Sequence, residues 1–161
     1  MTNDAAVEQT GVLPIEQLLC FDLYEATNAL AELYRPLLDD LGLTYTQYLA
    51  LVCLSPGTTV THQEMQRSLS LDRESLEPVV KRLEAAGLVD RRRSSLGRRD
   101  VEFCLTDAGM FVRSRFEGVQ CVVGEAMGLD NGEFAALQAS VRGLVEAVRG
   151  AMQSDTARGA R

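Results

Sequence analysis

The sequence lacks several features that would define a functional class. No apolar run approaches the roughly 18 residues that span a bilayer. The N-terminal stretch MTNDAAVEQTG carries acids where a signal peptide would carry positive charge. Aromatic residues make up only 6% of the 161 residues, although a hydrophobic fraction of 46% is enough for one core. We therefore predict a single soluble, cytoplasmic domain with no membrane partner.

Metal-binding patterns are also missing. The chain has one histidine, His62, and its four cysteines form no C-x-x-C pair, so we expect neither a zinc site nor a cofactor. In a reducing compartment the cysteines start as free thiols. Cys53 lies on an apolar helical face and is expected to be structural. Cys104 alternates away from Phe103 and is expected to face outward, and His62 is expected at the surface.

What the sequence does contain is a local excess of positive charge. The net charge is −7, but residues 81–99 hold seven bases and two acids, a net of +5 that leaves −12 for the rest of the chain. Such a stripe is typical of a nucleic-acid contact. A solvated charged hairpin would give the same pattern, and charge alone does not decide between them.

Apolar residues recur at helical spacing in most of the chain. Pro14 suits a first helical position, and Pro36 should end or kink the first helix. Thr61 and Glu64 form a capping-box pattern. Helices are predicted over residues 14–38, 44–54, 61–69, 71–89 and 107–127, and from 130 onward. The last of these carries an apolar face formed by Phe134, Leu137, Val141, Leu144, Val145 and Val148.

The helix over 71–89 has an ambiguous start. Pro78 loses no intrahelical bond if Ser75 caps the main turn, whereas a kink is expected if Asp72 is the cap. Gly87 is placed to cap the C-terminal end. The residues alone leave both starts open.

The stretch VDRRRSSLGRRDVEFCLT predicts a hairpin that carries five arginines. Val101, Phe103 and Leu105 alternate with polar residues, as in a strand with one buried face, and SSLG supplies the turn. Two short helices, a recognition helix and this hairpin predict a mostly α fold with a small β-hairpin wing, a winged helix-turn-helix.

Each part of such a fold has a task on DNA. A helix fits the major groove, and a wing can place arginine along the backbone or in the minor groove. Glu77 could accept a hydrogen bond from cytosine but also repels phosphate. The candidate DNA contacts are Arg73, Ser75, Glu77 and Lys81 on the helix and Arg93, Arg98 and Arg99 on the wing.

Three stretches, LGLTYTQYLAL, VVKRLEAAGLVDRRR and DVEFCLTDAG, resemble the multiple antibiotic resistance regulator (MarR) family. Within it, LLCFDLY, AELYRPLLDDLGLTYTQY and LDRESLEPVVKRLEAAGLV are similar to organic hydroperoxide resistance regulators. The resemblance implies a repressor that forms an intertwined helical homodimer on a palindromic operator in double-stranded DNA. Dimerisation would use residues 14–38 and 107–152, and the DNA-binding lobe would be 44–106.

The chain departs from that group at two places. Arg73 and Glu74 stand where small residues are usual, and Gly97 stands where the wing usually has an aspartate. Arg99 occupies the matching arginine position, so the resemblance implies a minor-groove contact there. Because Gly97 has no carboxylate, the side chain of Arg99 is held less firmly than in that group.

Cys20 is the candidate redox residue, since a thiolate reacts with peroxide. Burial among Leu18, Leu19 and Phe21 should raise its pKa, so an anion would need hydrogen-bond donors. Tyr24 lies one turn away on the same face.

Tyr34 shares that helical face but lies about 21 Å further along the axis, at about 1.5 Å per residue. It cannot reach its own Cys20, although an antiparallel second helix would bring it there. The resemblance implies that Cys20 is the reactive cysteine and that the partner supplies Tyr34 and Tyr45. Oxidation by organic hydroperoxide to a sulfenic acid, then to a disulfide or thiol adduct, would release the DNA. Apolar walls would favour organic peroxides.

Some members of the group use a second cysteine in the helix before the last, and Cys121 lies in that segment. It is a candidate resolving cysteine, and a core cysteine is an open alternative.

Other functions remain open at this point. The chain could be a repressor that responds to a small lipophilic or phenolic ligand, with Cys20 structural. A thiol peroxidase would need a charged residue near Cys20, and Arg35 is too distant, so we expect no enzyme. A helical dimerisation module without DNA binding is opposed by the arginine hairpin.

Overall fold

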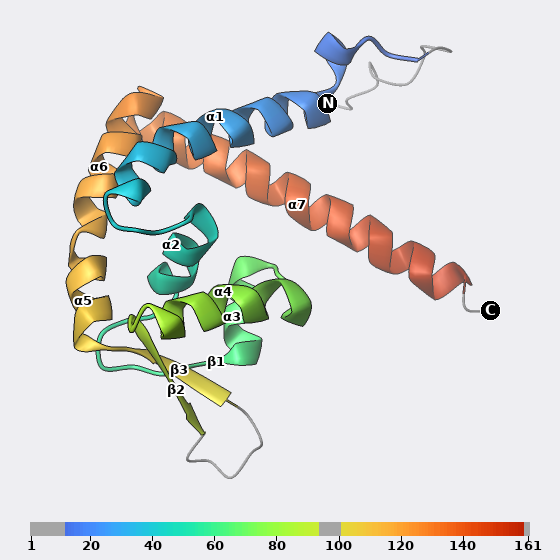
Figure 1. The fold of residues 1–161 in the computed structure, drawn as a ribbon. Helices are drawn as coiled ribbons and strands as arrows, with labels where there is room; N and C mark the ends of the chain where they lie inside the picture. Colours follow the sequence, from blue (N-terminus) through green and yellow to red (C-terminus); the bar gives the residue numbers. More distant parts are fainter. Residues whose placement is uncertain (1–11, 94–100, 160–161) are drawn as a thin grey trace. The chain divides into compact units, whose positions relative to one another are not determined.

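A computed structural model describes residues 12–93 and 101–159, with side chains described up to residue 153. The chain forms two compact units, Met1–Val119 and Gln120–Arg161. In the described ranges, no helix is long and apolar enough to cross a membrane. The elements are η1 (Ile15–Gln17), α1 (Leu19–Asp39), α2 (Tyr45–Val52), β1 (Val60–Thr61), α3 (His62–Leu69), α4 (Arg73–Ala85), β2 (Val89–Arg93), β3 (Val101–Leu105), α5 (Asp107–Ser114), α6 (Phe116–Met127) and α7 (Asn131–Gly159) (Figure 1).

The first unit is a winged helix-turn-helix, which confirms the predicted fold class. Its sheet is antiparallel with strand order β1-β3-β2, and Phe103 pairs with Val60 on one side and Arg91 on the other. The hairpin β2–β3, called the wing below, extends away from α3 and α4 in Figure 1. Phe103, Leu51, Met65 and Leu76 are fully buried between the helices and this sheet. One core therefore fixes both the recognition helix α4 and the base of the wing.

Side-chain caps begin these helices. Thr61 and Glu64 form the predicted capping box at α3, and Thr44 forms a second one at α2. Asp72 caps α4 by accepting a hydrogen bond from the Ser75 amide at 2.7 Å, which decides between the two starts. Pro78 then lies inside α4, and the helix is continuous through it.

The junction between α4, β3 and α5 explains the Leu-Thr-x-x-Gly stretch at 105–109. The Thr106 hydroxyl donates to the Gly87 carbonyl at 2.6 Å and accepts from the Gly109 amide at 3.0 Å. Gly87 has φ +69°, so it makes the predicted C-terminal cap of α4. The backbone of Gly109 lies directly against the Leu88 carbonyl, where a Cβ would clash. One threonine and one glycine thus tie the recognition helix to α5.

Two predicted helices are interrupted. Leu18 is extended between η1 and α1, so the first helix begins at Leu19 and Pro14 caps the short 3₁₀ turn instead of starting the helix. Pro36 does not end α1, which continues to Asp39. The predicted helix over 107–127 is divided at Arg115, whose amide bonds to the Val112 carbonyl three residues back.

The second unit contains the end of α6 and all of α7. Asp130 caps α7 by accepting from the Gly132 and Glu133 amides at 2.7 and 2.9 Å. The predicted apolar face of this helix does not lie in a core within the single chain. Phe134, Leu137, Val141, Val145 and Val148 are all exposed, and Leu144 is partly buried.

Candidate functional site

The recognition helix presents a polar face next to its buried one. Leu76, Val80 and Leu83 are buried, whereas Arg73, Ser75 and Lys81 are exposed. The candidate DNA contacts on α4 are therefore accessible, with the exception of Glu77. That carboxylate is partly buried and engaged in ion pairs.

Arg91 on β2 binds both Glu77 and Glu84 of α4. Its Nε and Nη2 atoms donate to the two carboxylate oxygens of Glu84 at 2.9 and 3.1 Å. Nη2 also donates to Glu77 Oε1 at 3.0 Å. Burial alone would raise the pKa of Glu77, but Arg91, together with Lys81 and His62, outweighs burial and holds the pKa below its ordinary value.

The base of the wing corrects two expectations. His62 is not a surface residue, since its side chain is only 12% exposed and its Nε2 lies 3.4 Å from Glu77 Oε2. Cys104 does not face outward but is buried, with its thiol 3.9 Å from the Asp90 carbonyl oxygen. Arg93 is exposed on β2, as a DNA contact requires. Gly97, Arg98 and Arg99 lie outside the described residues.

Cys20 lies on the first turn of α1 and is exposed in the single chain. The expected burial among Leu18, Leu19 and Phe21 is therefore not found. Tyr24, one turn on, is 63% exposed. Cys53, by contrast, is half-buried, and burial raises the pKa of its thiol, which agrees with a structural role.

Tyr34 on α1 and Tyr45 on α2 come together in the same chain. Their ring centroids are 4.9 Å apart, and the Tyr48 ring lies 5.5 Å from Tyr34 and 6.2 Å from Tyr45. Tyr48 is buried and packs edge-on against Phe116 at 4.7 Å, so it anchors the cluster to the core. Tyr48 was not among the residues predicted from the sequence, although its position one turn after Tyr45 on α2 was a usable signal.

Burial in this cluster keeps the phenols of Tyr34 and Tyr45 protonated. Burial, followed by the neighbouring Tyr48 and Tyr45, raises the pKa of Tyr34 from 10.0 to about 12. Burial and Tyr48 also raise the pKa of Tyr45. Both hydroxyls are therefore neutral hydrogen-bond donors at physiological pH.

This shift predicts a measurable titration. Phenolate absorbance of the folded wild type should contain a step near pH 12 that is absent from Tyr34→Phe and from the denatured chain. Because the folded state holds this proton more tightly, its contribution to stability is present below pH 10.0 and is lost as the pH rises toward 12. An unchanged high-pH step in Tyr34→Phe would contradict the assignment.

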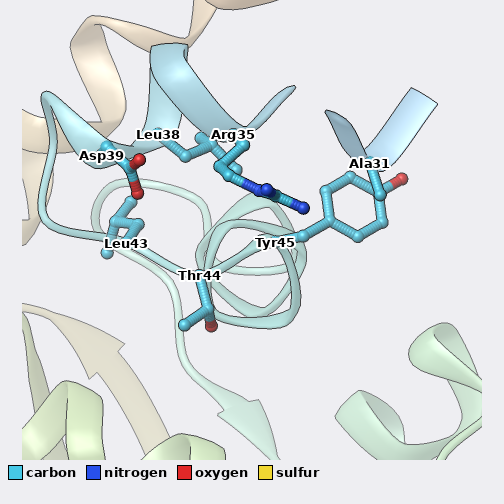
Figure 2. Close-up of a pocket in the computed structure, with 7 residues that line it drawn as sticks. All are labelled: Ala31, Arg35, Leu38, Asp39, Leu43, Thr44 and Tyr45. Carbon is cyan, nitrogen blue, oxygen red and sulfur yellow. The ribbon is translucent and has the colours of Figure 1, made fainter. Parts of the chain in front are cut away.

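A pocket of about 360 Å³ lies beside Tyr45, between the C-terminal half of α1 and the start of α2 (Figure 2). It combines a guanidinium, a carboxylate and a phenol with apolar walls. Its lining residues are Ala31, Arg35, Leu38, Asp39, Leu43, Thr44 and Tyr45.

Cys121 lies on the part of α6 that belongs to the second unit and is exposed. Its Sγ lies 3.6 Å from Glu125 Oε1, so the thiol can donate to that carboxylate. The side chain is thus accessible rather than part of a core, as a resolving cysteine would need to be.

An antiparallel sheet, a capped recognition helix with an exposed polar face and an arginine-bearing hairpin define a winged helix-turn-helix transcriptional regulator. The model of the MarR family matches residues 43–101. The organic hydroperoxide resistance transcriptional regulator of Bacillus subtilis (strain 168) is 40% identical over 103 residues, which cover 64% of this chain and 70% of that protein. The chain belongs to the MarR family of transcriptional regulators.

Further relatives agree with this assignment. The HTH-type transcriptional regulator TtmR of Methylorubrum extorquens (strain PA1) is 35% identical over 150 residues, covering 91% of this chain and 77% of TtmR. Reduced AbfR bound to DNA superposes with a TM-score of 0.69 at 29% identity, covering 83% of this chain and 92% of AbfR. Disulfide-formed AbfR gives 0.57 at 31% identity, with 79% and 89% covered. AbfR is a protein of Staphylococcus epidermidis.

Proposed function

We propose that this chain is a redox-sensing repressor that binds a palindromic operator as a homodimer and leaves it when organic hydroperoxide oxidises Cys20. The observation that carries the proposal is the pairing of Tyr34 with Tyr45 at 4.9 Å, away from the cysteine of the same chain. Tyr34 lies about 21 Å along α1 from Cys20 at about 1.5 Å per residue. The pair therefore serves the Cys20 of a second copy.

Two neutral phenols are suited to hold a thiolate. Each can donate a hydrogen bond to the sulfur anion, and such hydrogen bonds favour the charged form. Because Tyr34 has a pKa of about 12, it does not ionise at the pH where the thiolate forms. Tyr24 is exposed one turn from Cys20 and supplies a third candidate donor from the same chain.

The exposed apolar face of α7 supports the homodimer. Six large apolar side chains on this helix, Met152 and the five named above, are exposed in the single chain, and a second copy would bury them. We assign dimerisation to residues 14–38 and 107–152, and DNA binding to the lobe 44–106. In this dimer the two copies of α1 would run antiparallel, so that Tyr34 and Tyr45 of each chain would lie beside Cys20 of the other.

DNA binding is assigned to the exposed basic and polar side chains of the recognition helix and wing. Arg73, Ser75 and Lys81 would face the major groove, and Arg93, with Arg98 and Arg99, would follow the backbone or minor groove. AbfR, 29% identical to this chain, has been solved in its reduced form bound to DNA.

The proposed chemistry begins at the Cys20 thiolate. Its sulfur bonds to the terminal oxygen of the hydroperoxide, which carries the hydrogen, while the O–O bond breaks and an alkoxide leaves. The sulfur is thereby oxidised to sulfenic acid, and the alkoxide takes up a proton from water to become an alcohol. The sulfenic acid no longer accepts the tyrosine hydrogen bonds in the same way. A second thiol, for which Cys121 is the candidate, then forms a disulfide as water leaves.

A mixed disulfide with a small thiol is the alternative second step. In either case the α1 helices shift, and the two recognition helices no longer fit successive grooves. The names of two relatives agree with this class of signal, since one is an organic hydroperoxide resistance regulator and AbfR has a disulfide-formed state.

Operator binding with and without oxidant tests the proposal. Gel shifts of reduced wild type should be abolished by a stoichiometric organic hydroperoxide and restored by dithiol reductant. Cys20→Ser should stay bound under the same treatment, and Cys53→Ser is the matched control that should still release. Equal release of wild type and Cys20→Ser would contradict the proposal.

A ligand-responsive repressor is the second candidate, and the pocket beside Tyr45 favours it. Its Arg35 and Tyr45 side chains with apolar walls would suit a small lipophilic or phenolic molecule. Such a ligand would release wild type and Cys20→Ser alike, without any change in protein mass.

A further inference from the structure

Arg91 differs from the other arginines of the wing in how its charge is used. Its guanidinium makes three hydrogen bonds to two glutamates of α4, which stand seven residues apart on that helix. The contact with Glu84 is bidentate, the geometry in which arginine–carboxylate pairs are strongest. A strand of the wing is thus fastened to the recognition helix at two points.

The Arg91 guanidinium also lies over an aromatic ring. Its central carbon lies 5.2 Å from the ring centroid of Phe103, the residue that pairs with Arg91 across the hairpin. Phe103 is fully buried. The Arg91 side chain, which belongs to β2, therefore contacts both α4 and β3, and rotation of the wing on the helix would break its contacts with α4.

Glu77 joins this arrangement to the helix-turn-helix. It contacts Arg91 at 3.0 Å, His62 at 3.4 Å and Lys81 at 3.7 Å. His62 begins α3, so α3, α4 and β2 meet at one carboxylate. Lys81 itself stays 67% exposed and available to DNA.

The next arginines on β2 are not held in this way. Arg92 is 63% exposed and reaches Asp90 only at 4.0 Å. Arg93 is exposed. These two can turn toward phosphate, whereas the charge of Arg91 is matched within the protein.

We propose that Arg91 is a positioning residue that sets the wing on the recognition helix through Glu84 and Glu77, and that it does not itself contact DNA. The inference rests on the DNA binding proposed above. It assigns Glu77 to the support of the wing instead of to base reading. It also means that two acids close to the DNA surface promote operator binding.

The test compares two isosteric changes on one helix. Glu84→Gln removes an acid that holds Arg91, and Glu74→Gln removes an exposed acid that has no ion pair with any described residue. Charge alone predicts tighter binding for both. We expect Glu84→Gln to weaken binding of the reduced protein to its operator by about 5- to 30-fold, the effect of losing a charged hydrogen-bond partner, and Glu74→Gln to bind as tightly as wild type or tighter.

Arg91→Lys separates positioning from phosphate contact. Lysine keeps the positive charge but cannot make the bidentate hydrogen bonds of a guanidinium. We therefore expect Arg91→Lys to lose about as much operator affinity as Glu84→Gln, with an unchanged slope of log affinity against log salt concentration. A phosphate contact would instead retain most of its affinity in Arg91→Lys, and Arg91→Ala would lower the slope by about 0.9.

Footprinting distinguishes a displaced wing from a weakened fold. In Glu84→Gln, minor-groove protection by the wing should be lost while major-groove protection by α4 is kept at saturating protein. Glu84→Gln binding as well as Glu74→Gln, or losing both protections equally, would overturn the inference. A wild type that does not bind the operator at all would overturn the proposed function together with it.

Discussion

Cys20 in a Tyr34→Phe dimer is expected to react with organic hydroperoxide about 10- to 100-fold more slowly than in wild type, because a hydrogen bond to a charged group contributes about 1.5–3 kcal/mol. The removed hydroxyl is one of two that would hold the thiolate, and its ring stays packed against Tyr45 and Tyr48. Operator affinity of the reduced protein should stay unchanged. Stopped-flow measurement of thiol loss gives the rate, and a gel shift gives the affinity.

A mixed dimer shows whether the tyrosine acts across the subunits. When one chain carries Cys20→Ser and the other carries Tyr34→Phe, sharing between chains leaves one intact cysteine–tyrosine pair. The single Cys20 thiol of each mixed dimer should then react at the wild-type rate. If each tyrosine served the cysteine of its own chain, the remaining Cys20 would lie beside the phenylalanine and would react slowly. A slow reaction of Cys20 in all mixed dimers would therefore disprove sharing between the chains.

Gly109→Ala is expected to lower the free energy of unfolding by about 3 kcal/mol or more, since an added methyl group that strikes backbone cannot be relieved by side-chain rotation. The new Cβ would fall on the Leu88 carbonyl, with Leu105 close on another side. Relief would require separating α5 from the segment between α4 and β2, where Leu88 lies. Urea denaturation followed by circular dichroism measures the loss.

Gly118→Ala provides the matched control for that measurement. Gly118 is also helical, but a Cβ there would meet nothing within 4 Å. Alanine should therefore stabilise the helix by about 0.5–1 kcal/mol. A similar loss in both variants would show that helix flexibility, and not the contact with Leu88, is the reason for glycine at 109.

Local chemistry made much of the fold predictable. The Thr61–Glu64 capping box, the glycine that ends α4 and the strand around Phe103 each depend on neighbours in sequence, and the structure has all three. The predicted alternation along that strand was wrong, because Cys104 is buried beside Phe103. The candidate cysteine and tyrosines were predicted from helical spacing and resemblance. What helical geometry added was the exclusion of Tyr34 as a partner for its own Cys20.

Most of the features that were missed depend on contacts between distant segments. Nothing near Arg91 in sequence indicates that its charge is matched by Glu77 and Glu84, because the pairing needs β2 to return along α4. His62 is drawn in by the same cluster. The division at Arg115 has no proline or glycine to mark it, although the Ser114 hydroxyl bonds to the Phe111 carbonyl at 2.7 Å and so competes locally with the helix.

The exposure of Cys20 in the single chain has a consequence for when sensing begins. In the proposed site a lone subunit carries a thiol and a pair of phenols that cannot meet, so it lacks the anion-holding donors that speed the reaction. Reactivity toward peroxide would then follow the monomer–dimer equilibrium, and newly made chains would be protected from premature oxidation until they assemble. Peroxide would then inactivate only repressor molecules that had already assembled into DNA-binding dimers.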